Sequence, residues 1–507
     1  MRHHNLTKRL LEIGCQPIDS STDRGMLYLA YQNHAFKSQI EYVFQAILNV
    51  YGVAGVTICF DDLAGIEFQP SNIVISYGKE KPRGLFTNHI HIYESALFGE
   101  NYLTARSMPR LPLGRYGGIP VIYEGDGDTQ NHMAARQMKS RYRSIETNVD
   151  IVASSFFMLS RYEEIVSTER DQYGRFPARE SIAYKEGFVD RPVVNEYLEL
   201  LWNWIDSFGL GIMRKPLWPQ GKDFAVCLTH DVDHVRKWES DRHSARLLLR
   251  DKPFEATRLW SGSIVSMLKR ENPYWNFEEI VAREKQYGFN SSFYFLAGRH
   301  HPFDGSYKIN SNEVRALIKW LENEGAEVGL HGSFESYNNE AMLSNELATL
   351  TSIAKNVCGV RQHRLRLDPQ LTFSAQEKAG LGYDTTLGFA EHEGYCSGFA
   401  FPYHPYDLGR NRPFALLEIP LTIMDGTLSQ PQYRNLTPDK GWEATKKILE
   451  TTKRFKSCVT LLWHNSCFDQ SCSPGFGDIY WKALEWIHDS NGWGTSGREV
   501  CKWWSLR

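Results

Sequence analysis

The chain has 507 residues, which exceeds the usual size of one domain and predicts two or three. Its residues are 42% apolar, 13% aromatic and 23% charged, as is typical of a soluble globular protein. A net charge of −3 provides no extended positive field, which argues against nucleic acid or an anionic membrane as the main partner.

The N-terminal stretch MRHHNLTKRLLEIG has no long apolar core and no small-residue cleavage site, so we do not expect a signal peptide. No apolar run approaches the roughly 18 residues of a membrane-spanning helix. The nine cysteines follow no CxxC or zinc-finger spacing, and Cys227 and Cys458 stand inside apolar runs. These features predict a cytoplasmic protein with free, largely buried thiols.

The first part of the chain predicts mixed α and β structure. Helical spacing of apolar residues, ended by Gly52, predicts a helix over 38–52. Further apolar patterns predict strands at 55–62, 71–78 and 89–99 and helices at 150–166 and 193–209. The segment 213–223, with two prolines and mixed charge, is the predicted linker, and we place the domain boundary near residue 215.

From residue 222 onward, short apolar strands alternate with amphipathic helices. The predicted strands are 224–229, 291–298, 327–331, 359–367 and 458–465, with helices at 277–288, 312–325 and 339–357 between them. This order predicts an α/β fold with a parallel sheet or a β/α barrel. In such folds, ligands bind at the carboxyl ends of the strands.

Polar clusters terminate four apolar strands: Asp231 and Asp233 in THDVDH, His331 in EVGLH, Arg361 and His363 in VRQH, and His464 in LLWHN. Two carboxylates two positions apart on an extended segment face the same side. One can therefore bind a divalent cation while the other stays free as a base. A neutral histidine at such a position is a good metal ligand.

Each motif also has an ordinary structural explanation. The acids could cap a turn or a helix, and a lone histidine is commonly a satisfied core side chain. His230, His234 and His243 are interpreted as surface residues or as supports of the site. The aromatic segment 388–407 could contact a sugar or could be an ordered structural loop. The shared position of the main motifs at four strand ends favours a site over coincidence.

The order of the motifs makes residues 222–507 resemble the polysaccharide deacetylases with a NodB-type fold, similar to carbohydrate esterase family 4. The whole chain resembles a bacterial subgroup with an additional N-terminal domain of unassigned function. The motifs that carry this resemblance are SRYEEIVSTERDQYGRF, FVDRPVVNEYLELL, THDVDH, LHGSFES, VRQHRLR, GYDTTLGFAEHEGY and LLWHNSCF. It implies a smaller mixed α/β domain over 1–215 and a NodB-type distorted β/α barrel over 216–507.

The resemblance also implies roles for the strand-end residues. Asp231 matches the catalytic base, Arg361 the arginine beside it, and His464 the general acid. Asp233 and His331 match two metal ligands.

The match departs from the family at the next ligand, where a histidine four positions after His331 is replaced by Glu335. We expect His363 to be the third ligand, with Glu335 as the alternative. The family's fourth motif has no clear counterpart, and Asp384 is the candidate for it.

The implied activity is metal-dependent hydrolysis of an N-acetyl, or alternatively O-acetyl, group on a sugar or surface-polysaccharide precursor. The implied cofactor is one divalent ion, zinc, with cobalt or nickel as alternatives. Three other functions stay open: a degenerate deacetylase fold that binds a glycan or a protein partner, a glycosyltransferase that uses Asp231 and Asp233, and hydrolysis of a non-sugar amide. The oligomeric state cannot be predicted.

Overall fold

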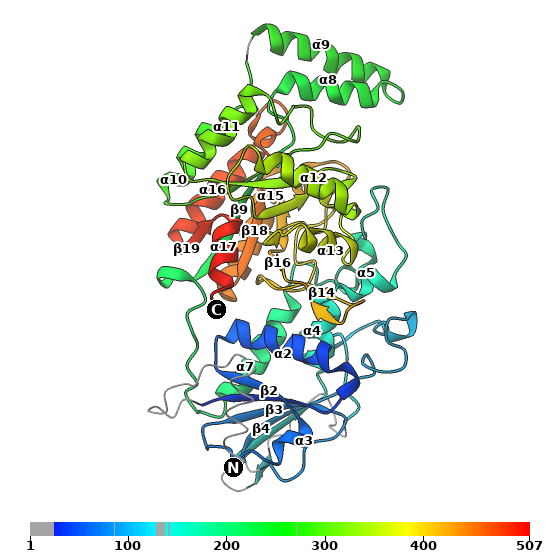
Figure 1. The fold of residues 1–507 in the computed structure, drawn as a ribbon, viewed down its shortest axis with the longest axis vertical. Coiled ribbons are helices and arrows are strands. Elements are labelled where there is room, and N and C mark those ends of the chain that lie inside the picture. Colours follow the sequence, from blue (N-terminus) through cyan, green and yellow to red (C-terminus); the bar gives the residue numbers. More distant parts are fainter. Residues whose placement is uncertain (1–24, 86, 128–136, 140–141, 270) are drawn as a thin grey trace.

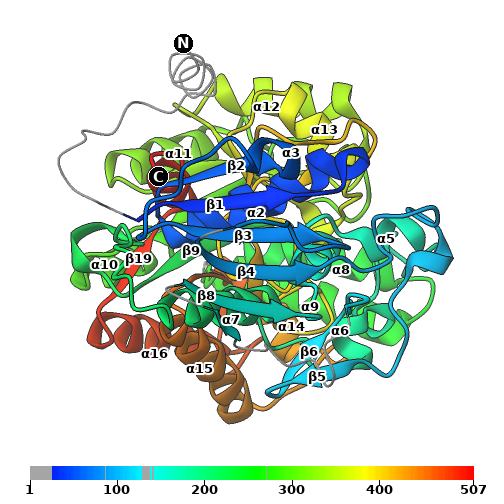
Figure 2. The same cartoon turned by 90° about the horizontal axis from the view of Figure 1, so that it is seen from below.

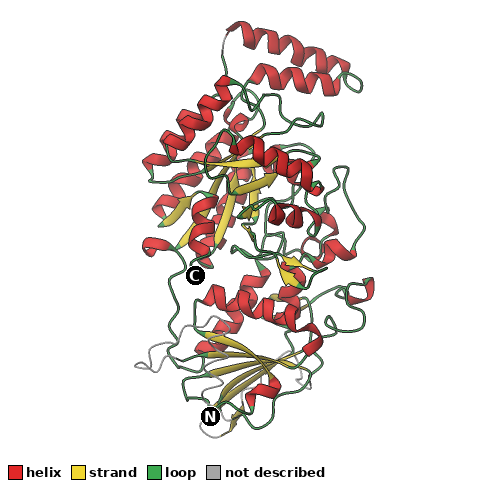
Figure 3. Ribbon diagram, viewed as in Figure 1, coloured by secondary structure: helices red, strands yellow, loops and turns green. Residues whose placement is uncertain are grey.

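The computed structural model describes residues 25–85, 87–127, 137–139, 142–269 and 271–507. The N-terminal stretch that we examined for a signal peptide lies outside this set. Two sheets with their helices occupy the two ends of the long axis of the molecule (Figures 1 and 3). Within the described residues, no helix has the length and apolar character needed to cross a membrane. The cysteines of the described residues form no disulfide.

The N-terminal sheet has six strands in the order β2–β1–β3–β4–β8–β7. The strands are β1 (Leu27–Tyr31), β2 (Gly55–Cys59), β3 (Ile73–Gly78), β4 (Asn88–Tyr93), β7 (Gln137–Lys139) and β8 (Tyr142–Thr147). All neighbours pair in parallel except β7 with β8. Figure 2 looks onto these strands from below. A separate hairpin joins β5 (Gly114–Tyr116) to β6 (Ile119–Val121).

The helices of this half are α2 (Lys37–Tyr51), α3 (Phe60–Leu63), α4 (Ile151–Leu159), α5 (Tyr162–Val166), α6 (Ile182–Lys185) and α7 (Val193–Asp206). The prediction of α2 is confirmed, and the helix ends at Gly52 in the left-handed conformation. Helix α4 is buried along its whole length because it lies between the N-terminal sheet and the other half of the chain (Figure 1).

The predicted continuous helix over 150–166 is wrong in one respect. Arg161 adopts φ 54, in the left-handed region, and separates α4 from α5. Its buried guanidinium lies beside Glu163 and Glu164, which explains why this backbone turn is retained at a non-glycine residue.

The C-terminal sheet has nine strands in the order β16–β13–β12–β11–β10–β9–β18–β17, and β19 also pairs with β9. The strands are β9 (Phe224–Val232), β10 (Ser292–Leu296), β11 (Glu327–Gly332), β12 (Gly359–Gln362), β13 (Tyr383–Asp384), β16 (Leu417–Glu418), β17 (Leu421–Met424), β18 (Cys458–Leu462) and β19 (Gly492–Thr495). Every pairing in this sheet is parallel. The predicted α/β class is confirmed. The pairings within the described residues do not join β16 to β17, so the barrel is open.

Helices connect these strands: α8 (Lys237–Leu248), α9 (Pro253–Lys269), α10 (Phe277–Gln286), α11 (Asn312–Asn323), α12 (Glu340–Thr351), α13 (Leu371–Lys378), α14 (Asp425–Ser429), α15 (Pro438–Arg454), α16 (Phe476–Asp489) and α17 (Gly497–Trp504). A small hairpin of β14 (Tyr406–Asp407) and β15 (Arg412–Pro413) lies toward the N-terminal half. As the sequence pattern predicts, α11 buries the face that carries Val314, Leu317, Ile318 and Leu321.

The aromatic segment 388–407 packs between the two halves. The Tyr395 N–H donates to the Val189 carbonyl at 2.8 Å, and Phe399 and Phe401 are buried. Because these rings are covered by protein, the structural interpretation of this segment holds rather than sugar contact.

Candidate metal centre

The parallel strands bring their carboxyl ends to one edge of the C-terminal sheet, which is where the predicted site residues meet. Strand β9 carries Asp231 and leads into Asp233, β11 carries His331, β12 carries Arg361 and leads into His363, and β18 leads to His464. Residues up to 233 positions apart in sequence thus lie in one cluster.

Asp233, His331 and His363 form a group that could hold a metal ion, with one ligand atom from each within 4.8 Å of the others. The Nε2 of His331 lies 3.3 Å from Asp233 Oδ1, and the Nε2 of His363 lies 3.8 Å from the same oxygen. The three side chains therefore converge on one point.

Both imidazoles are oriented for ligation. His331 Nδ1 lies 2.8 Å from the Arg361 carbonyl, which can only accept, so Nδ1 carries the proton and Nε2 keeps its lone pair. His363 Nδ1 lies 3.4 Å from Asp304 Oδ1, which favours the same tautomer. No sequence pattern marks Asp304, because it stands in the loop between β10 and α11.

The chemistry of the group fits a divalent cation. Asp233 Oδ1 is buried and meets no hydrogen-bond donor within the described residues. Burial alone would raise the pKa of Asp233, but His363, His331 and His464 outweigh it and hold the pKa well below its usual value. A carboxylate oxygen without a donor, beside two imidazoles that present Nε2, is a donor set that zinc and similar ions accept.

Asp231 is paired with a buried arginine. Arg361 donates from Nη1 to Asp231 Oδ1 at 2.9 Å, and its guanidinium is held by the Thr385 carbonyl and the Thr229 hydroxyl. Burial alone would lower the pKa of Arg361, but Asp231 outweighs it and raises that pKa. The pair is therefore a fixed carboxylate–guanidinium contact that lies directly beside His331, whose Nε2 is 3.7 Å from Asp231 Oδ2.

His464 is bound by a carboxylate that we did not predict. Asp425, which follows β17, accepts from the His464 backbone N–H and from Nδ1–H, both at 2.8 Å. Burial alone would lower the pKa of His464, but Asp425, with smaller contributions from Asp233 and Asp231, raises it to about 10. Asp425 lies at the carboxyl end of a strand, like the other site residues.

Two alternatives from the sequence lie outside the cluster. Glu335, the alternative third ligand, has a half-exposed carboxylate that pairs with Arg366 at 3.8 Å. Asp384 is buried in β13, where it accepts from Gln376 Nε2 at 2.7 Å and from Thr386 Oγ1 at 2.6 Å. Both are held by neighbours away from the metal ligands.

The additional histidines divide into two kinds. His230 is fully buried and lies 2.9 Å from Glu284 Oε1, so the surface interpretation is wrong for it, and a supporting role stays a prediction. His234 lies 2.9 Å from Ser306 Oγ and packs near His243 at the rim of the site.

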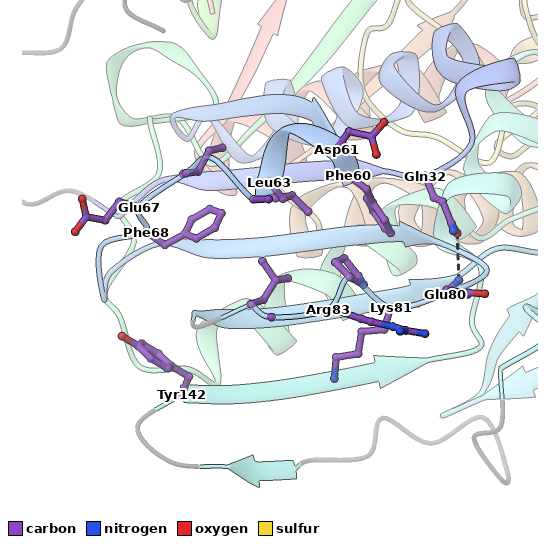
Figure 4. Close-up of a pocket in the computed structure, with 15 residues that line it drawn as sticks. Gln32, Phe60, Asp61, Leu63, Glu67, Phe68, Glu80, Lys81, Arg83 and Tyr142 are labelled. Carbon is purple, nitrogen blue, oxygen red and sulfur yellow. Dashed lines mark hydrogen bonds between the residues drawn. The ribbon is translucent and has the colours of Figure 1, made fainter. Parts of the chain in front are cut away.

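A separate cavity of about 620 Å³ lies on the N-terminal sheet (Figure 4). Its lining includes Phe60, Phe68, Lys81, Arg83 and Tyr142. None of the strand-end residues lines it, so it does not belong to the candidate metal centre.

The fold and the site define an α/β protein with a candidate metal centre at the carboxyl edge of a parallel sheet. In comparisons with known proteins, residues 28–209 match a family of unknown function, DUF7033. A search of curated proteins finds no match.

Three solved structures are similar to more than half of the chain. A protein described as a polysaccharide deacetylase from Mycobacterium smegmatis is 18% identical, with a TM-score of 0.41, over 57% of this chain and 93% of that one. Puue allantoinase is 13% identical, with a TM-score of 0.40, over 58% and 95%. A protein described as a polysaccharide deacetylase from Pseudomonas aeruginosa PAO1 is 12% identical, with a TM-score of 0.41, over 58% and 96%.

Proposed function

We propose that the C-terminal half is a metal-dependent deacetylase that acts on an N-acetyl, or alternatively O-acetyl, group of a sugar or surface-polysaccharide precursor. One observation carries the proposal. The Asp233–His331–His363 group lies against both an arginine-bound carboxylate and a carboxylate-bound histidine. The ordered motifs that resemble those of polysaccharide deacetylases support the choice of a sugar substrate. The cytoplasmic location stays a prediction.

Asp233, His331 and His363 would hold one divalent ion, zinc in our proposal, with cobalt or nickel as alternatives. When bound, such an ion polarises an acyl carbonyl and lowers the pKa of a water molecule.

Asp231 is the proposed general base. Its carboxylate accepts a proton from the attacking water, while Arg361, 2.9 Å away, fixes its orientation. The Thr385 and Thr229 contacts keep the guanidinium in place through the reaction.

His464 is the proposed general acid. Its Nδ1–H is committed to Asp425, so the proton available to a leaving group is on Nε2, which lies 3.7 Å from Asp233 Oδ2. A pKa raised to about 10 keeps this imidazole protonated at neutral pH. Transfer of the Nε2 proton to the departing nitrogen, with attack of water on the carbonyl, yields a free amine and acetate.

The alternative of a degenerate, binding-only protein was motivated by the histidine missing at position 335. The position of His363 supports an active centre instead, because it supplies a third ligand from the neighbouring strand.

The first test is metal content after purification without an affinity tag, for the wild type and for the D233A/H331A double variant. We expect about one divalent ion per wild-type chain and none in the variant, with E335Q as the matched control that keeps its metal. Acetate release from acetylated sugars should follow metal content. Failure of the wild type to bind zinc, cobalt or nickel would leave the binding-protein alternative.

A further inference from the structure

Helices α8 and α9 form a hairpin that projects from the C-terminal half, at the end of the molecule opposite to the N-terminal sheet (Figure 1). The hairpin is inserted between β9 and α10, and its two helices pack against each other. The outer helix, α9, turns one long side to solvent.

Exposed apolar side chains gather on this hairpin. Of the 14 large hydrophobic residues that are exposed within the described chain, eight lie between residues 247 and 268. Phe254 is 87% exposed, Leu268 73% and Leu249 59%. The others are Leu247, Trp260, Ile264, Val265 and Met267. A patch of this kind on a soluble domain marks an interaction surface.

The hairpin is also basic. Residues 237–269 contain seven Lys or Arg and four Asp or Glu, a net charge of +3 in a chain whose net charge is −3. At its tip, Arg246, Arg250, Lys252 and Arg258 are exposed next to Leu249 and Phe254. The hairpin therefore has a local positive field, although the net charge of the whole chain is negative.

We propose that the α8–α9 hairpin docks onto an anionic lipid surface. A helix with basic side chains and exposed Phe, Trp and Leu lies in the headgroup region, where its apolar face reaches the acyl boundary and its cations meet anionic headgroups. Trp260 has the amphipathic ring that favours this boundary.

A second copy of the chain fits this surface less well. In a two-fold hairpin-to-hairpin contact, the same basic tip would be present on both sides, and like charges would oppose each other. An anionic lipid surface complements both the charge and the apolar residues.

The position of the hairpin links docking to the metal centre. Helix α8 begins at Lys237, shortly after the ligand Asp233, and the ring of His243 on α8 lies 5.9 Å from the ring of His234. Docking would bring the rim of the site toward the lipid surface. If the proposed deacetylase function holds, its substrate is then a sugar carried on a lipid; this step rests on that function, whereas docking does not.

The test is co-sedimentation of the full chain with vesicles of phosphatidylcholine alone and of phosphatidylcholine mixed with phosphatidylglycerol. We expect the wild type to bind the mixed vesicles, and the binding to weaken with salt. The F254S/L268S and R250Q/K252Q/R258Q variants should each bind more than about tenfold more weakly. L371S, which changes an exposed leucine on α13, is the matched control and should bind like the wild type.

Because the mutated side chains are exposed, all variants should keep the circular dichroism spectrum of the wild type. Absence of wild-type binding to the mixed vesicles would overturn the proposal, as would unchanged binding by both hairpin variants. A dimer seen by light scattering, abolished by F254S/L268S and without vesicle binding, would assign the surface to a second copy. Since no outcome depends on acetate release, failure of docking is separable from failure of the proposed reaction.

Discussion

Asp425 binds His464 through both of its carboxylate oxygens: Oδ2 accepts the backbone N–H and Oδ1 accepts Nδ1–H, each at 2.8 Å. The first bond fixes the end of β18 against β17, and the second fixes the tautomer of the imidazole. One carboxylate thus both positions His464 and raises its pKa to about 10.

Asp425→Asn tests whether His464 acts as an acid. Activity that requires protonated His464 falls as pH rises through the pKa of that group. The substitution removes the main cause of the raised pKa, so the fall should occur more than about one pH unit lower. We also expect kcat at neutral pH to drop roughly ten- to a hundredfold. The measurement is the pH profile of kcat and kcat/KM for acetate release.

The matched control for this variant is Asp489→Asn. Asp489 also contacts a histidine, His488, at 3.1 Å, but both side chains are exposed. That change should leave the profile intact. An alkaline limb at the same pH in Asp425→Asn and the wild type would contradict the role given to His464.

The third metal ligand is tested by His363→Ala beside Glu335→Ala. His363 converges on Asp233, whereas Glu335 pairs with Arg366 at the surface. We expect His363→Ala to lose bound metal and activity, and Glu335→Ala to keep the wild-type metal content. Metal analysis by mass spectrometry after dialysis is the readout. The reverse pattern would assign the ligand to Glu335.

The sequence predicted much of this site because of one rule: parallel strands gather the residues at their carboxyl ends. Asp231 and His331 lie near the ends of the apolar strands β9 and β11, whose pattern is easily read. Asp425 was missed because β17 is only Leu421–Met424 and pairs with β18 across a register shift, so no clear strand pattern precedes the acid.

Other features had no local signal. Asp304 is in a loop, and only the fold brings it within 3.4 Å of His363. The break at Arg161 interrupts a strongly apolar helical pattern, and a left-handed arginine has no sequence signature. The basic character of the α8–α9 hairpin does not appear in the net charge of the whole chain, because acidic residues elsewhere outweigh it.

Arg161 is expected to be important for stability. Its buried guanidinium donates from Nε to Glu164 Oε1 at 2.8 Å and also donates to the Cys396 carbonyl in the segment 388–407. Arg161→Ala would leave Glu163 and Glu164 buried without their cation, at a cost of about 3–5 kcal/mol. Alanine at position 161 would adopt the same strained left-handed backbone. The loss of stability would therefore report mainly the removal of the arginine side chain.

Urea unfolding of Arg161→Ala should therefore show a clearly lower midpoint than the wild type. Arg454→Ala is the control, because Arg454 pairs with Glu199 at the surface and its loss should cost less than about 1 kcal/mol. Equal midpoints for the two variants would show that the buried contact does not stabilise the fold.

The last prediction concerns acid stability of the N-terminal sheet. Ser76 Oγ lies 2.6 Å from His89 Nε2 and 2.7 Å from His91 Nδ1, and all three side chains are buried. Burial lowers the pKa of both histidines, that of His91 from 6.5 to about 4. The unfolded chain therefore binds protons at a higher pH than the folded one.

Stability from this cluster should be complete above pH 6.5 and should decline as pH falls toward 4, where folded His91 also becomes protonated. Within that window each histidine contributes about 1.4 kcal/mol per pH unit. Urea midpoints followed by tryptophan fluorescence between these pH values are the measurement. His91→Gln should unfold more easily at neutral pH but lose less stability on acidification. An equally steep loss in that variant would place the acid sensitivity elsewhere in the chain.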